Sequence, residues 1–108
     1  MSGKKKRRTP EWEWEQSLID DYYDYRWWQL LEPLYQKFQI WKRGQLDHEE
    51  VSLAIHKTNK ATRALHTFFE ERRDLLVSLI QLDKDWFGEW LKSHPAPRGM
   101  RIIKLSDG

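Results

Sequence analysis

Residues 47–87 read DHEEVSLAIHKTNKATRALHTFFEERRDLLVSLIQLDKDWF and contain neither glycine nor proline. Their apolar residues recur at alternating steps of three and four, the spacing of one face of an amphipathic helix. We therefore predict one long helix over about residues 48–82. Asp47 is its predicted N-cap, because Glu50 follows at the third helical position and completes a capping box. The predicted packing face carries Val51, Ala54, Thr58, Ala61, Leu65, Phe68, Leu75, Leu79 and Leu82.

A first long helix is predicted over about residues 10–42. Thr9 is its N-cap, and Pro10 suits the first helical position because the N–H that proline lacks would have no partner there. Gly44 is predicted to end this helix. Pro33 lies inside it, so we expect a kink or a break one turn before that residue. The apolar face of this helix carries Ile19, Tyr23, Trp27, Leu30, Leu34, Phe38 and Trp41.

The four-residue link between these helices, residues 44–47, forces them to run antiparallel. Pairing Trp41 with Val51 then places Tyr23 near Phe69. The same register places Arg72 opposite Asp20 and Asp24, where we expect an ion pair between the helices. It also brings Trp12, Trp14 and Leu18 near Leu79, Trp86 and Trp90.

The predicted fold is all-α. A long antiparallel helical hairpin is followed by a short C-terminal helix, which begins after Asp83 and ends near Lys92. We expect residues 10–93 to form this hairpin domain, residues 1–9 a disordered basic arm and residues 94–108 a flexible C-terminal tail.

Aromatic residues occupy a second side of the first helix. Tyr25, Trp28 and Tyr35 lie about 180° from the first apolar face, and a hairpin cannot bury both sides of one helix. Exposed aromatic patches usually mark partner sites. We therefore expect dimerisation to complete a helical bundle, with a different helical protein partner or cover by the same chain as alternatives. The predicted protein interface consists of Tyr25, Trp28, Tyr35, Trp86 and Trp90.

Charge is divided unevenly along the chain. The net charge is +2, but residues 9–93 carry 11 basic and 16 acidic side chains. The N-terminal arm could bind nucleic-acid phosphates, although such a run is equally typical of a targeting signal or a solubilising tail. Three further basic residues, Lys57, Lys60 and Arg63, share one side of the second helix. The arm's basic residues are Lys4, Lys5, Lys6, Arg7 and Arg8.

Several function classes are disfavoured. The chain has no cysteine, so disulfides and thiolate chemistry are excluded. We find no motif for phosphate, metal or nucleophilic chemistry, so we expect no cofactor, no metal and no catalytic activity. No apolar run predicts a membrane span or a secretory signal, so we expect a cytoplasmic protein. The predicted function is a non-catalytic protein–protein interaction or assembly module, and the alternative is a nucleic-acid-binding accessory protein that uses the basic arm.

Overall fold

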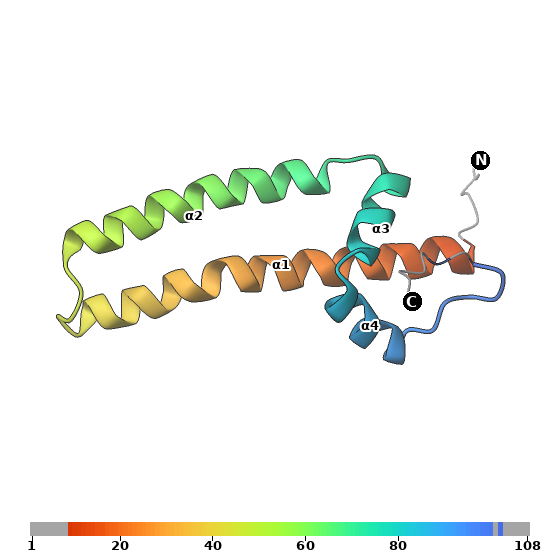
Figure 1. The fold of residues 1–108 in the computed structure, drawn as a ribbon, viewed down its shortest axis with the longest axis horizontal. Coiled ribbons are helices and arrows are strands. Elements are labelled where there is room, and N and C mark those ends of the chain that lie inside the picture. The colour runs from red at the N-terminus through yellow and green to blue at the C-terminus, as the bar shows by residue number, and fades with distance from the viewer. Residues whose placement is uncertain (1–8, 101, 103–108) are drawn as a thin grey trace, which may run out of the picture. The chain divides into compact units, whose positions relative to one another are not determined.

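The computed structural model describes residues 9–100 and 102. It contains the helices α1 (Pro10–Lys42), α2 (His48–Phe69), α3 (Arg73–Gln81) and α4 (Lys84–Ser93) in that order (Figure 1). No strand occurs among the described residues, and the prediction of an all-helical protein is confirmed. The predicted basic arm, apart from Thr9, lies outside the described residues.

The helix ends form where the sequence places them. The Thr9 hydroxyl accepts a hydrogen bond from the Trp12 backbone N–H at 3.0 Å, as an N-cap does. Gly44 follows α1 with φ 78°, a left-handed conformation that glycine adopts at low cost. The Asp47 carboxylate accepts from the Glu50 N–H at 2.9 Å and caps α2. These three predictions are confirmed.

Pro33 does not break α1, which continues from Pro10 to Lys42. A proline removes one backbone hydrogen bond, the one to the carbonyl four residues earlier. That carbonyl belongs to Gln29, which is exposed, so solvent can satisfy it. Of the two outcomes predicted for Pro33, a kink or a break, the break is therefore wrong.

The single long helix predicted over residues 48–82 is also wrong. α2 ends at Phe69, and α3 begins only at Arg73. Between them, Glu70 keeps helical dihedrals while Arg72 is extended, with φ −58° and ψ 148°. Residues 73–81 therefore form a separate helix.

The break changes which face of residues 73–81 is buried. The uninterrupted pattern assigned Leu75 and Leu82 to the packing face, yet both are exposed. α3 buries Leu76, Val77 and Ile80 instead. Both faces of this segment carry apolar residues, so periodicity alone could not choose between them. Burying a Leu, Val or Ile side chain contributes roughly 1.5–3 kcal/mol, so the buried face offsets the hydrogen bonds lost at the break.

The chain divides into two compact units. Unit 1 comprises Met1–Asp21 and Arg72–Gly108, and unit 2 comprises Tyr22–Glu71. α1 contributes its first twelve residues to unit 1 and the remainder to unit 2.

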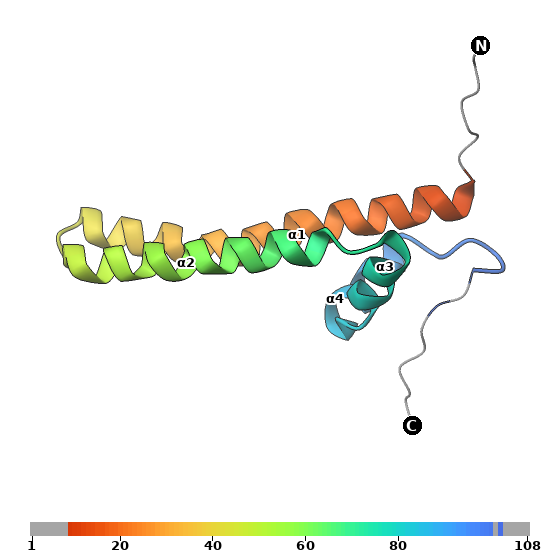
Figure 2. The same ribbon diagram turned by 90° about the horizontal axis from the view of Figure 1, so that it is seen from above.

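Unit 1 has an aromatic and aliphatic core. α3 and α4 pack against each other (Figures 1 and 2). The Trp14 ring meets the rings of Phe87 and Trp90 edge-on, with centroids 6.2 and 5.3 Å away, so the predicted approach of Trp14 to Trp90 is confirmed. Buried indoles need acceptors: Trp90 Nε1 donates to Asp21 at 2.8 Å. The buried apolar residues are Trp14, Leu18, Leu76, Val77, Ile80, Phe87 and Trp90.

The C-terminal end of α4 is joined to this core through His94. Its ring stacks on Trp90 at 4.2 Å, and its carbonyl accepts from Trp14 Nε1 at 2.8 Å. The first residue of the predicted tail is thus part of the packing of unit 1. On the exposed side of α4, a hydrogen bond from Lys92 to Glu89 and the attraction between their charges raise the pKa of Lys92.

Unit 2 is held by a few contacts between α1 and α2. The Tyr23 and Phe69 rings lie 5.0 Å apart, as the predicted register requires. Trp27 meets His66 edge-on at 5.5 Å. At the other end, Trp41 Nε1 donates to His48 Nδ1 at 2.9 Å. All residues of unit 2 are described, and its buried apolar residues are Tyr22, Val51 and Leu65.

Candidate protein-binding surface

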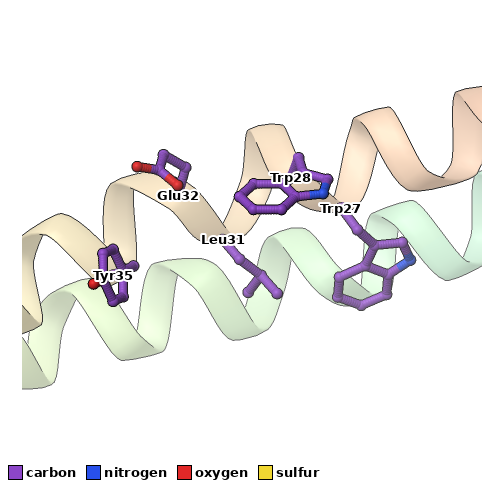
Figure 3. Close-up of a pocket in the computed structure, with 5 residues that line it drawn as sticks. All are labelled: Trp27, Trp28, Leu31, Glu32 and Tyr35. Atoms are coloured by element: carbon purple, nitrogen blue, oxygen red, sulfur yellow. The ribbon is translucent and has the colours of Figure 1, made fainter.

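Side chains of α1 in unit 2 line an apolar hollow of about 510 Å³. Figure 3 shows them along the same stretch of helix, with the Trp27 and Trp28 rings at one end and Tyr35 at the other. We call this set the aromatic hollow. Its lining residues are Trp27, Trp28, Leu31, Glu32 and Tyr35.

Three of these side chains are unusually exposed for their type. Trp28 is 69% exposed, Tyr35 54% and Leu31 43%. An isolated exposed apolar residue is ordinary on a protein surface, but neighbouring ones of this size are typical of binding sites. The aromatic hollow is therefore the strongest candidate site among the described residues.

Helical spacing explains why these residues meet. Leu31 lies four residues from both Trp27 and Tyr35 and three residues from Trp28, and residues at those spacings are neighbours on a helix. The first apolar face of α1 and its second, aromatic side lie about half a turn apart, and Leu31 therefore connects them. Sequence reasoning did not single out Leu31, although its spacing to both sides was available as a signal.

Polar groups border the hollow. Glu32 accepts a hydrogen bond from Gln36 at 2.7 Å, which holds its carboxylate along the helix. The buried Trp27 Nε1 has no hydrogen-bond partner. An unpaired buried donor costs about 1–3 kcal/mol, so the Trp27 ring is held here by packing rather than by polar pairing.

The structure separates the predicted interface residues. Trp28 and Tyr35 line the aromatic hollow. Tyr25 is half-buried, lies 5.8 Å from the Tyr22 ring and accepts a hydrogen bond from Gln29. In unit 1, Trp90 is buried and Trp86 stacks on it at 6.0 Å. Trp90 belongs to the core of unit 1, whereas Trp86 is half-buried beside it and stays a predicted interface residue outside the aromatic hollow. The predicted nucleic-acid contacts, Lys4, Lys5, Lys6, Arg7 and Arg8, lie outside the described residues.

A smaller hollow of about 290 Å³ lies at the start of α2 and is lined in part by Glu49, Glu50 and His56. Within residues 9–100 and 102, no group of three or more histidine, aspartate or glutamate side chains is placed to hold a metal ion. In the same part of the chain, no helix has both the length and the apolar character that a bilayer crossing needs.

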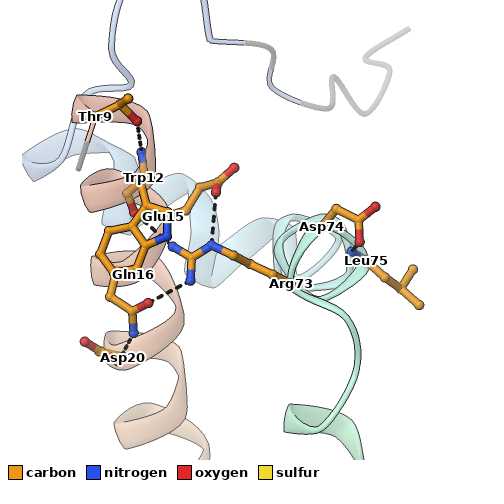
Figure 4. Close-up of polar contacts among 8 residues, drawn as sticks. All are labelled: Thr9, Trp12, Glu15, Gln16, Asp20, Arg73, Asp74 and Leu75. Atoms are coloured by element: carbon orange, nitrogen blue, oxygen red, sulfur yellow. Dashed lines mark hydrogen bonds and ion pairs between the residues drawn. The ribbon is translucent and has the colours of Figure 1, made fainter. Parts of the chain in front are cut away.

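Arg73 is the centre of a polar cluster in unit 1 (Figure 4). Its guanidinium donates to the Gln16 side chain at 2.8 Å and to the Trp12 carbonyl at 3.0 Å, and it lies 3.4 Å from the Glu15 carboxylate. It also lies over the Trp12 ring, 4.4 Å from the centroid. Because these groups bind one another, we interpret the cluster as a structural clamp rather than a binding site.

This clamp replaces the predicted ion pair of Arg72 with Asp20 and Asp24. Arg72 lies 3.5 Å from Asp74, and both side chains are exposed. The Asp20 carboxylate accepts a hydrogen bond from Gln16 instead. The prediction failed because it assumed a continuous helix through residues 70–72.

Comparison of the chain with protein-family profiles, curated proteins and solved structures gave no match.

Proposed function

We propose that this protein is a non-catalytic protein-binding module whose binding surface is the aromatic hollow of unit 2. One observation carries the proposal: unit 2 exposes more large apolar side chains than it buries. Its exposed set consists of Tyr23, Trp28, Leu31, Tyr35, Phe38, Trp41, Leu53 and Ile55, against the buried Tyr22, Val51 and Leu65.

The free energy available from burying the exposed apolar side chains of unit 2 supports the proposal that a partner covers them. Burying a large apolar side chain contributes roughly 1.5–3 kcal/mol, and unit 2 leaves most of that contribution unused. A unit with few buried residues is marginally stable alone, and a partner that covers the hollow would stabilise it by mass action.

The architecture we infer for unit 2 is the antiparallel hairpin of α1 and α2. The Tyr23–Phe69, Trp27–His66 and Trp41–His48 contacts support it. In such a hairpin the exposed Trp28, Leu31 and Tyr35 lie on a side of α1 that α2 does not cover, and this leaves a helix face open to another helix.

Photo-crosslinking tests the proposed surface. We would place p-benzoylphenylalanine at Tyr35, where its shape matches the native ring, in the full chain expressed in its own cells. Irradiation should give protein adducts, either to a second copy or to another protein. The same amino acid at Lys57, exposed on α2, serves as the matched control and should give few adducts. Equal adduct yields at both positions, or none at Tyr35, would count against the proposal.

One structural observation supports the alternative function, nucleic-acid binding. Lys57, Lys60 and Arg63 are all exposed on α2, where they could extend a phosphate-binding track from the basic arm. Retention of the full chain on DNA or RNA at low salt, lost on deletion of residues 1–9, would favour this function. No retention at low salt would remove it.

A further inference from the structure

The apolar surface of α1 has a negative charge at one end and a positive charge at the other. Asp24 and Lys42 are both exposed and lie eighteen residues apart. At about 3.6 residues per turn this separation is five full turns, so the two charges share one line along the helix, about 27 Å apart. Both lie in unit 2, as does all of α1 between them.

The residues between these charges are arranged symmetrically. Pro33 lies nine residues from each charge, on the opposite side of the helix. Leu31 and Tyr35 lie two residues on either side of Pro33, and within about 20° of the line that joins the charges. Trp28 and Phe38 lie five residues on either side, and within about 40° of it. All four of these apolar side chains are exposed.

We propose that the aromatic hollow binds a second copy of this chain, with α1 packed antiparallel against its own symmetry mate about a two-fold axis level with Pro33. Asp24 of each copy then faces Lys42 of the other. In the same register Leu31 meets Tyr35, and Trp28 meets Phe38. This inference rests on the proposed function and specifies the partner.

An antiparallel pair is the arrangement that the two end charges, Asp24 and Lys42, favour. A two-fold interface brings the same patch of both copies together, so a patch must be complementary to itself. In a parallel pair Asp24 would face Asp24 and Lys42 would face Lys42, and like charges disfavour an interface. In the antiparallel pair both charges meet their opposites.

The neighbouring side of α2 carries no lysine, arginine, aspartate or glutamate to oppose this contact. Trp27 and Trp41 meet α2 at His66 and His48, which marks the side of α2 that adjoins the aromatic hollow. Residues 22–71 together carry seven basic and seven acidic side chains, so unit 2 itself adds no net charge repulsion between two copies. The residues at helical spacing along that side of α2 are His48, Ser52, Ile55, Asn59, Thr62 and His66.

The available area suits a dimer of moderate affinity. The exposed parts of Trp28, Leu31, Tyr35 and Phe38 amount to roughly 400 Å² per copy, about half of the ~800 Å² that each partner buries in a standard interface. The side of α2 that adjoins the aromatic hollow, which has no lysine, arginine, aspartate or glutamate, can supply the remainder. We therefore expect dimerisation in the micromolar range.

A charge-swap series on the full chain tests the register. Sedimentation equilibrium at low salt should show that Asp24→Lys and Lys42→Asp each weaken the dimer roughly tenfold, because each places two like-charged pairs in the interface. An equimolar mixture of these two variants should form a heterodimer, and the double variant should dimerise like the native chain. Lys37→Asp makes the same charge change on a side of α1 away from the line that joins Asp24 and Lys42. It is the matched control and should leave the dissociation constant unchanged.

The outcomes separate this inference from the function on which it rests. A native chain that stays monomeric at about 100 μM, or a dimer that responds to Lys37→Asp as strongly as to Lys42→Asp, overturns the antiparallel dimer. Protein adducts at Tyr35 in a monomeric chain would leave the binding module standing and replace the second copy with a different protein. Circular dichroism of each variant verifies that the helices are intact.

Discussion

Replacing Arg73 with alanine should destabilise unit 1, whereas the same change at Arg72 should not. The two arginines are adjacent in sequence but differ in surroundings. Arg73 is half-buried and meets three residues of α1, while Arg72 pairs only with an exposed Asp74 among the ion pairs of the described residues. The pair is therefore a matched test of the clamp.

The magnitude follows from the contacts of Arg73. Its hydrogen bonds to Gln16 and to the Trp12 carbonyl contribute about 1 kcal/mol each. The position over the Trp12 ring adds about 0.5–1 kcal/mol. The Glu15 pair adds about 0.5 kcal/mol after solvent screening, because about a third of each side chain remains exposed. The alanine variant avoids the entropy cost of ordering the arginine side chain, about 1 kcal/mol, so the net loss of unfolding free energy is about 2 kcal/mol.

Hydrogen exchange measured by mass spectrometry gives a readout local to unit 1. Amides of α3 should exchange roughly 30-fold faster in Arg73→Ala than in the native chain, which corresponds to about 2 kcal/mol. Arg72→Ala should change the same amides less than about twofold, because an exposed ion pair contributes little. Arg73→Lys should fall between them, since lysine keeps the charge but not the planar fork.

Equal exchange in Arg72→Ala and Arg73→Ala would refute this reasoning. Protection lost more strongly in Arg72→Ala would indicate that the originally predicted pairing of Arg72 holds in solution. Urea unfolding followed by circular dichroism provides an independent estimate of the free energy change.

Three further predictions concern single positions. Leu18→Ala should lower the unfolding free energy by roughly 2–5 kcal/mol, because Leu18 is fully buried, and a shift of the urea midpoint below about 1 kcal/mol would contradict its place in the core. Trp90→Phe should cost about 1–3 kcal/mol in thermal unfolding, since it removes the donor to Asp21 as well as part of a buried ring, and Asp21→Ala in the Trp90→Phe background should then add only the small loss of its partly exposed contact with His94 at 3.8 Å. Asp47→Ala should cost about 1 kcal/mol by loss of the bond to the Glu50 N–H, while Asp47→Asn should be nearly neutral; the helical circular dichroism signal against temperature compares them.

Local chemistry made the helix ends predictable. Thr9, Gly44 and Asp47 act through their own side chain or their own backbone freedom on residues within one turn. Such effects are written into neighbouring residues and need no knowledge of the tertiary structure. For the same reason the all-helical character could be predicted from spacing alone.

The aromatic hollow was only partly predictable. Trp28 and Tyr35 stood out because aromatic side chains on a second helix face need cover. That Trp27 and Leu31 line the same hollow depends on the directions of the side chains along α1. A description of the helix as two separate apolar sides does not include these directions. Trp86 and Trp90 looked equally suited to an interface, but the packing of Trp90 on Trp14 and His94 places Trp90 in unit 1's own core, while Trp86 stays half-buried.

The sequence by itself determined that the protein is helical, where α1 and α2 begin, and that α1 carries excess aromatic surface, because each of these depends on residues within a few turns. Only the tertiary structure decided that the glycine- and proline-free stretch 47–87 does not form one helix. No residue at positions 70–72 forbids a helix. The chain leaves it there because Leu76, Val77 and Ile80 gain burial and because Arg73 gains partners in α1 that lie about sixty residues away in sequence.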